Sequence, residues 1–159
     1  ILFYKADYLN EIQRIIHKYH CDPSRIILEV TEGITMDNLD EMKVLVRELH
    51  KMGFAVSMDD FGSGYSSLNI LKELDIDELK LDRVFLSDTA EKEKRDIIMK
   101  NIITLARELQ ITTVTEGVED AAQAEFIHSI HCDIGQGYYF AKPMPEDAFE
   151  LFIAGKTEE

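Results

Sequence analysis

The sequence is poor in basic residues and has no long apolar run, and each shortage argues against a class of protein. Lysine and arginine number 17 against 31 acidic residues, which gives a formal net charge of −14. Because so acidic a surface repels a nucleic-acid backbone, we expect no nucleic-acid duplex as a partner. No apolar run is long enough to span a bilayer, so we expect no membrane contact from this segment.

Cysteine is scarce as well, since Cys21 and Cys132 are the only two. Without a signal peptide, they point to a cytoplasmic location rather than to a disulfide framework, although a longer parent protein could be membrane-anchored through other domains. Each cysteine directly follows a histidine. These pairs lack the short ligand spacing of zinc sites, so a zinc centre is a weak alternative.

Strand-like and helix-like segments alternate along the 159 residues, which are enough for one domain with a sizeable core. Apolar residues at helical spacing predict helices within residues 7–19, 37–52, 66–74, 88–110, 120–130 and 146–153. Apolar and β-branched runs predict strands over residues 26–32, 54–60, 78–82, 111–116 and 132–140. Such alternation implies an α/β fold of about five parallel strand–helix units joined by right-handed crossovers.

The two acids Asp59 and Asp60 stand where an apolar strand ends, before a loop with Gly62 and Gly64. Adjacent carboxylates at the end of a buried strand repel each other, so they predict a bound divalent cation. Strand alternation predicts that Asp59 and Asp60 point to different sides. The alternative is a helix N-cap, in which Asp60 or Ser63 accepts backbone N–H bonds.

Polar residues also gather at the C-terminal ends of the other predicted strands, the edge that carries active sites in parallel α/β folds. In chain order the set is Glu29, Glu32, Asp59, Asp60, Lys80, Asp82, Glu116, Glu119 and Gln136. An open doubly wound sheet and a partial (β/α)8 TIM-type barrel both fit this pattern, and we expect the barrel. The order of these groups argues against a phospho-acceptor receiver domain, which needs its acid pair on the first strand and a lysine on the last.

Taken together, five motifs resemble the bacterial EAL-domain cyclic-di-GMP phosphodiesterases over about residues 7–152. They are Leu28–Glu32, Asp59–Leu68, Leu79–Asp82, Thr115–Glu119 and Gly135–Tyr138. The resemblance implies a barrel whose rim binds two Mg²⁺ or Mn²⁺ ions and hydrolyses cyclic di-GMP to linear pGpG.

The resemblance also implies roles for individual residues. Glu29, Asp59, Asp60 and Glu116 would bind metal, with Asp59 shared between the two ions. Glu116 and Lys80 would be catalytic, the first through the attacking water and the second through its charge. Gln136 and Asp82 would contact substrate. Glu32 and Glu119 would support the site, with the loop of Gly62 and Gly64, which the family also uses in dimerisation.

Three features of the family have no counterpart in these 159 residues: the Glu-Ala-Leu motif with its metal-binding glutamate, a nearby arginine and an asparagine ligand. We therefore expect residues 1–159 to be the C-terminal portion of an EAL domain, truncated at its N-terminus, and expect the chain alone to be inactive. The alternative is an inactive EAL-like module that binds cyclic di-GMP or a protein partner. Five barrel strands leave two open edges and an uncovered apolar interior, so we expect a homodimer.

Overall fold

The computed structural model describes residues 5–31, 33, 38–62, 68–87 and 92–155. Five strands form one parallel sheet: β1 (Ile27–Thr31), β2 (Ala55–Phe61), β3 (Glu78–Leu81), β4 (Thr112–Thr115) and β5 (Ile134–Gly135). Their order in the sheet is the order in the sequence, each strand pairing with the next. A doubly wound sheet reverses its strand order, whereas a barrel does not. The fold is therefore a partial TIM-type barrel, as predicted.

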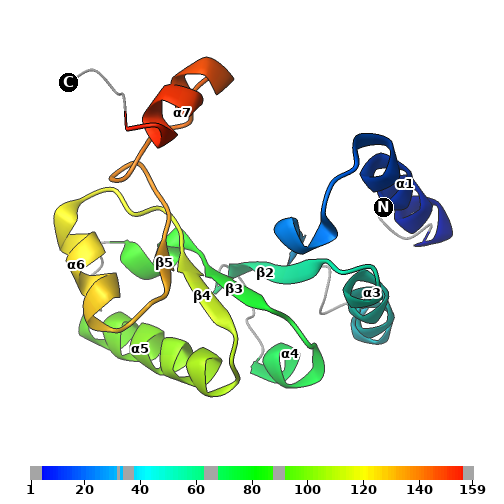
Figure 1. Cartoon of the computed structure of the whole chain (residues 1–159). Coiled ribbons are helices and arrows are strands. Elements are labelled where there is room, and N and C mark those ends of the chain that lie inside the picture. Colours follow the sequence, from blue (N-terminus) through cyan, green and yellow to red (C-terminus); the bar gives the residue numbers. More distant parts are fainter. Residues whose placement is uncertain (1–4, 32, 34–37, 63–67, 88–91, 156–159) are drawn as a thin grey trace.

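Helices alternate with these strands close to the predicted positions. They are α1 (Lys5–Tyr19), α3 (Leu39–Lys51), α4 (Leu68–Glu73), α5 (Lys92–Glu108), α6 (Ala121–Ser129) and α7 (Glu146–Ile153), with the short 3₁₀ helices η1 (Pro23–Arg25) and η2 (Arg83–Leu86). Helices α4, α5 and α6 lie along one side of the sheet, while α7 stands apart from it (Figure 1). Within the described residues, no helix is long and apolar enough to cross a membrane.

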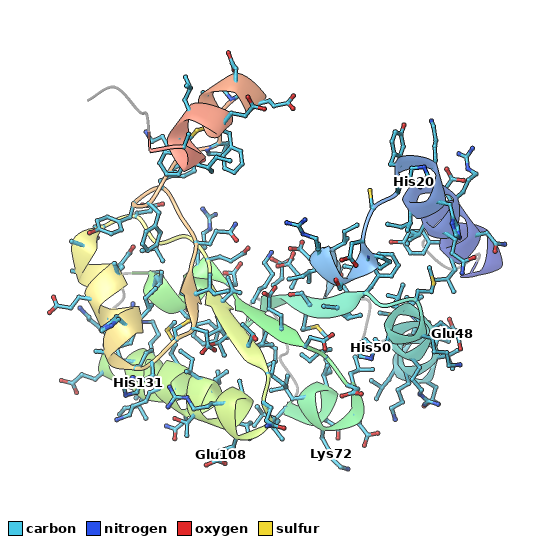
Figure 2. The ribbon with its side chains drawn as sticks, in the orientation of Figure 1. His20, Glu48, His50, Lys72, Glu108 and His131 are labelled. Carbon is cyan, nitrogen blue, oxygen red and sulfur yellow. The ribbon has the colours of Figure 1, made fainter. Side chains whose placement is uncertain are left out.

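The core lies between the sheet and these helices. Val56, Met58, Leu79 and Leu81 alternate along β2 and β3 and are fully buried. Met99 of α5 belongs to the same core cluster as Met58, Leu79 and Leu81. The outward sides of the helices carry charged side chains such as Lys72 and Glu108 (Figure 2). Burying this face of the sheet removes its apolar side chains from water, which stabilises the fold.

The opposite face of the sheet is open, and it is not the apolar surface that we expected. Glu29 on β1 pairs in register with Ser57 on β2, and both alternate with the residues that face the helices. Lys80 and Asp59 lie on the same open face, where Ile27 is 48% exposed. The open face is polar toward the strand ends, because in a complete barrel it lines the active-site end of the interior.

The last strand is much shorter than the predicted range of 132–140. It spans only Ile134–Gly135. Gln136 N donates the last hydrogen bond to β4, at Thr115 O, and the chain then turns to pack against the loop that follows β4. Val118 N donates to Gln136 O, and Tyr139 N donates to Val118 O. An added Cβ on Gly137 would lie 2.1 Å from Val118 O, so only glycine permits this approach.

Candidate metal centre

Lys80 occupies the middle of the cluster of polar residues at the strand ends. Its side chain is 9% exposed, and Nζ lies 2.7 Å from Glu29 Oε1, 3.0 Å from Asp59 Oδ1 and 2.8 Å from Glu116 Oε1. Lys80 projects from β3, whereas the carboxylates belong to β1, β2 and the residue after β4. The ammonium has three donors, so each can face one carboxylate. The strand ends therefore converge, as the sequence predicted.

Asp59 and Asp60 do not point to opposite sides, and the prediction from strand alternation is wrong here. The register shifts between Met58 and Phe61, so both aspartates oppose the single residue Lys80. This is a β-bulge, in which an extra residue bends the strand and redirects its side chains. Asp60 has φ +59°, a left-handed conformation that aspartate tolerates better than most residues.

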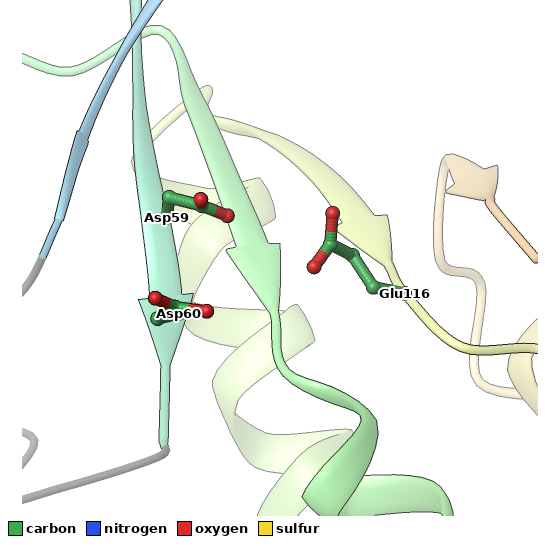
Figure 3. A group of neighbouring side chains, drawn as sticks. All are labelled: Asp59, Asp60 and Glu116. Atoms are coloured by element: carbon green, nitrogen blue, oxygen red, sulfur yellow. The ribbon is translucent and has the colours of Figure 1, made fainter.

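The bulge brings both aspartates close to Glu116, which lies just beyond β4. One carboxylate oxygen from each of Asp59, Asp60 and Glu116 lies within 4.8 Å of the other two. Figure 3 shows Asp59 and Asp60 at the end of β2 and Glu116 near the end of β4, with β3 between them. In the part of the chain that the structure describes, no other group of acidic, histidine or cysteine side chains has this geometry.

The residues present suit a divalent cation for two reasons: they carry excess negative charge, and some of their buried oxygens lack a hydrogen-bond partner in the described chain. With Glu29, the cluster holds four carboxylates against one ammonium, a formal surplus of three negative charges when all are ionised. Asp59 Oδ1 is buried and makes no hydrogen bond of acceptable geometry within the described chain, despite its 3.0 Å distance to Lys80 Nζ. Ser57 Oγ, two residues earlier on the same face, is likewise buried without a partner there. Hard oxygen donors of this kind suit Mg²⁺ and Mn²⁺.

The carboxylates hold Lys80 in its charged form. Burial disfavours the ammonium, but the close contacts with the Glu116, Glu29 and Asp59 carboxylates outweigh it and raise the pKa of Lys80 above its ordinary value. Lys80 therefore stays protonated at neutral pH. It can donate hydrogen bonds and neutralise charge, but it cannot accept a proton.

A pocket of about 370 Å³ adjoins the carboxylate cluster on the side of β4 and β5. It is lined by Asp82, Arg83, Glu116, Gly117, Glu119, Gln136, Gly137 and Tyr138. Four of these were predicted as site residues, and the pocket shares Glu116 with the cluster. Asp82 also caps η2, because its Oδ1 accepts a bond from Val84 N at 2.7 Å.

Some predicted residues lie elsewhere, and others were missed. Glu29 reaches Lys80 but is not one of the three carboxylates within 4.8 Å. Glu32 and Gly64 lie outside the described residues. The sequence reasoning did not single out Arg83 or Tyr138. Each stands beside a predicted residue at a strand end, and that proximity was the available signal.

The fold and the cluster define a class: an α/β-barrel segment with a cluster of carboxylates at the C-terminal ends of its strands. A sequence model of the EAL domain matches residues 2–143, and the chain belongs to this family.

Similar proteins agree with this assignment. MucR of Pseudomonas aeruginosa, a bifunctional diguanylate cyclase/cyclic di-GMP phosphodiesterase, is 39% identical over 152 residues, which cover 96% of this chain and 22% of MucR. A structure of the PaMucR phosphodiesterase in complex with c-di-GMP matches with a TM-score of 0.85 and 38% identity, over 92% of this chain and 60% of that one.

A more distant structure adds a metal to the comparison. The manganese/cyclic-di-GMP complex of Klebsiella pneumoniae BlrP1 matches with a TM-score of 0.81 and 25% identity, over 89% of this chain and 36% of that one. The chain spans about a fifth of the length of curated relatives such as MucR and Bacillus subtilis YkoW.

Proposed function

We propose that this chain forms part of a metal-dependent phosphodiesterase that hydrolyses cyclic di-GMP to linear pGpG. The observation that carries the proposal is the convergence of Asp59, Asp60 and Glu116 within 4.8 Å, beside the Lys80 ammonium. The structures of relatives named as complexes with cyclic di-GMP support the choice of substrate. The substrate is itself anionic, so an acidic site needs cations in order to bind it.

The metal ligands in this proposal are Asp59, Asp60 and Glu116, with Glu29 adjacent. Asp59, whose buried Oδ1 has no hydrogen-bond partner within the described chain, is the residue that would be shared by two ions of Mg²⁺ or Mn²⁺. When bound, two such ions lower the pKa of water and neutralise charge on the attacking and leaving oxygens of a phosphodiester.

In this proposal Glu116 takes the proton of the attacking water, and Lys80 supplies positive charge. Glu116 follows β4 directly, is only partly exposed, and belongs both to the carboxylate cluster and to the lining of the pocket. In this proposal Glu116 would hold the attacking water and receive its proton. Lys80, whose raised pKa keeps it charged, is placed to orient that water and balance the phosphate.

The pocket beside Glu116 is the proposed place for the nucleotide. The Gln136 amide offers both donor and acceptor atoms, and the Asp82 carboxylate offers acceptors, so together they suit the polar edge of a guanine base. Tyr138 is 61% exposed and presents a ring on which a base can stack. Glu119 is exposed at the same rim and supports the loop after β4.

Binding of cyclic di-GMP with and without metal tests this function. The purified chain is titrated with cyclic di-GMP in Mn²⁺ and in EDTA, alongside Asp59→Asn and Glu116→Gln. We expect binding that needs Mn²⁺ and weakens by at least about tenfold in Asp59→Asn. Glu125→Gln, an exposed charge change on α6, is the matched control and should bind as the wild type does.

The same titration separates the enzyme from the inactive binding module. Binding of equal strength in EDTA would favour the module, and no binding under either condition would contradict the proposal. The chain alone is expected to show little hydrolysis, because the family's other metal ligands are absent from these 159 residues. Clear turnover with Mn²⁺ would refute that expectation.

A further inference from the structure

Both chain segments that carry the metal-binding carboxylates continue into a glycine with a left-handed backbone. Gly62 follows Asp60 by two residues and has φ +98°, and Gly117 follows Glu116 directly and has φ +71°. Side chains of L-residues rarely adopt such angles, so each carboxylate group is followed by a turn that only glycine makes without strain. Between the two turns lies η2, which follows β3.

The ring of Phe85 in η2 fills the space left by Gly62. A Cβ added to Gly62 would lie 2.0 Å from Phe85 Cε2 and 2.5 Å from Cζ. The ring is therefore in direct contact with the backbone that follows Asp60. Phe85 is half-buried and also packs against the main hydrophobic core, so the ring is held from behind. Aromatic rings have few rotamers, and one packed in this way is rigid.

Arg83, at the start of the same turn, fills the space left by Gly117. A Cβ added to Gly117 would lie 2.5 Å from Arg83 Cβ and 3.5 Å from Arg83 Cα. The Gly117 backbone thus rests on the base of the Arg83 side chain, one residue after Glu116. This contact uses the aliphatic part of Arg83, a residue that also lines the pocket.

Backbone bonds join the two residues that lead from β3 into η2 to the ends of both ligand-bearing strands. Asp82 N donates to Phe61 O at 3.2 Å, and Glu116 N donates to Leu81 O at 3.0 Å. The Asp82 carboxylate caps the turn through Val84 N. As a result, η2 contacts the backbone beyond Asp60 on one side and the backbone beyond Glu116 on the other.

We propose that Phe85 and Arg83 are positioning residues that set the distance between the Asp59–Asp60 pair and Glu116. Each acts through the glycine that it packs against. The consequence for metal affinity rests on the proposed function, whereas the effect on backbone order does not. Residues that orient metal ligands in this way commonly change affinity by about 10- to 100-fold when altered.

Amide hydrogen exchange in the metal-free chain tests the positioning directly. We expect Phe85→Ala to speed exchange at Phe61 and Gly62 by at least about tenfold beyond its effect on global unfolding. Leu86→Ala, which removes a core side chain from the same turn, is matched for lost stability and should show only the global effect. Val84→Ala, at a 45% exposed position, should change nothing. Equal local exchange in Phe85→Ala and Leu86→Ala would overturn the proposal.

Titration with Mn²⁺ measures an affinity that a general loss of stability would leave unchanged as long as the variant is folded. We expect Phe85→Ala to weaken Mn²⁺ binding by about tenfold under conditions where the variant is folded, and Phe85→Leu to restore part of it. Leu86→Ala should bind Mn²⁺ as the wild type does. Unchanged affinity in Phe85→Ala would count against the positioning role. If the wild type binds no Mn²⁺, the proposed function fails, and the exchange measurement still decides the role of Phe85.

A double-variant cycle tests the contact itself. Gly62→Ala places a methyl group against the Phe85 ring and should speed local exchange strongly, since the backbone angle is strained as well. Adding Phe85→Ala makes room for that methyl group, so we expect the double variant to exchange more slowly near Asp60 than additivity predicts. Strictly additive effects would show that the ring does not hold this turn.

Discussion

At the scale of single residues, Lys80 holds the metal-free cluster together. Its ammonium lies within 3.0 Å of carboxylates from three separate segments, and removing it would leave these charges facing one another. Because the close contacts with the carboxylates outweigh its burial, the pKa of Lys80 is raised and the charge persists. Lys80 thus stabilises the folded chain and, in the proposed reaction, balances the charge of the phosphate.

We predict that Lys80→Met lowers the free energy of unfolding by about 2 kcal/mol without metal, less than for a fully buried pair because Glu29 is partly exposed. Added Mn²⁺ should reduce this loss, since bound cations neutralise the same carboxylates. Urea denaturation with and without Mn²⁺ measures both. Lys43→Met, which breaks a pair with Glu73, is the control and should not respond to Mn²⁺. An equal loss for Lys80→Met under both conditions would speak against a metal site here.

The pH dependence follows from the raised pKa of Lys80. A group whose folded pKa lies above its unfolded value, here 10.5, contributes fully below that value and loses its contribution as pH rises through the folded pKa. We predict that the stability difference between wild type and Lys80→Met stays constant from about pH 7 to pH 9 and shrinks only in stronger alkali. Denaturant melts across that range provide the measurement, and a difference that vanished near neutrality would contradict the charged state.

Residue chemistry was easier to predict from the sequence than residue geometry. Acids, a lysine and an amide at successive strand ends predict convergence, because parallel strands end at one edge. The direction of Asp60 could not be predicted, since it depends on a bulge whose extra residue is visible only from the register of β2 against β3.

At the scale of elements, the end of β5 is fixed by one close approach between backbones. An added Cβ on Gly137 would meet Val118 O, N and C within 2.7 Å, so the pocket floor depends on glycine. We predict that Gly137→Ala costs at least about 2 kcal/mol of unfolding free energy, because backbone must move to admit the methyl group. Gly33→Ala, where nothing lies within 4 Å, is the control for thermal or urea denaturation. Equal stability of the two variants would contradict this account of the turn.

Element order and most boundaries could be predicted from periodicity, and the range of α7 was predicted as it is observed. The short η2 was missed, because four residues are too few to show a helical pattern. The strand predicted at 132–140 was too long, because its apolar residues pack in a turn rather than in a ladder. Both errors lie next to the pocket, where close backbone contacts override local preference.

At the scale of the whole molecule, β1 and β5 are the outer strands of the sheet, and no strand in the described part of the chain pairs with their outer edges. Helix α7 stands apart from the sheet and exposes apolar side chains, among them Phe149 at 50% and Ile153 at 65% (Figure 1). Surfaces of this kind recruit other chains. The homodimer expected from the sequence therefore remains a prediction, with these edges and the apolar side chains of α7 as its proposed interface.

Light scattering at high protein concentration tests that prediction. We expect self-association of the isolated chain, reduced in a Phe149→Ser/Ile153→Ser variant because the exposed apolar area falls. Val44→Ser removes a similarly exposed apolar side chain from α3 and serves as the control. A sharp monomer peak for the wild type would refute the prediction.

The central claim is that three carboxylates from separate parts of the chain bind divalent cations together. Crystals of the chain grown with Mn²⁺ can be measured at a wavelength where manganese scatters anomalously. The account predicts an anomalous peak in contact with Asp59, Asp60 and Glu116, lost in Asp59→Asn. Saturating Mn²⁺ with no peak at this cluster, or a peak only on other surface acids, would contradict it.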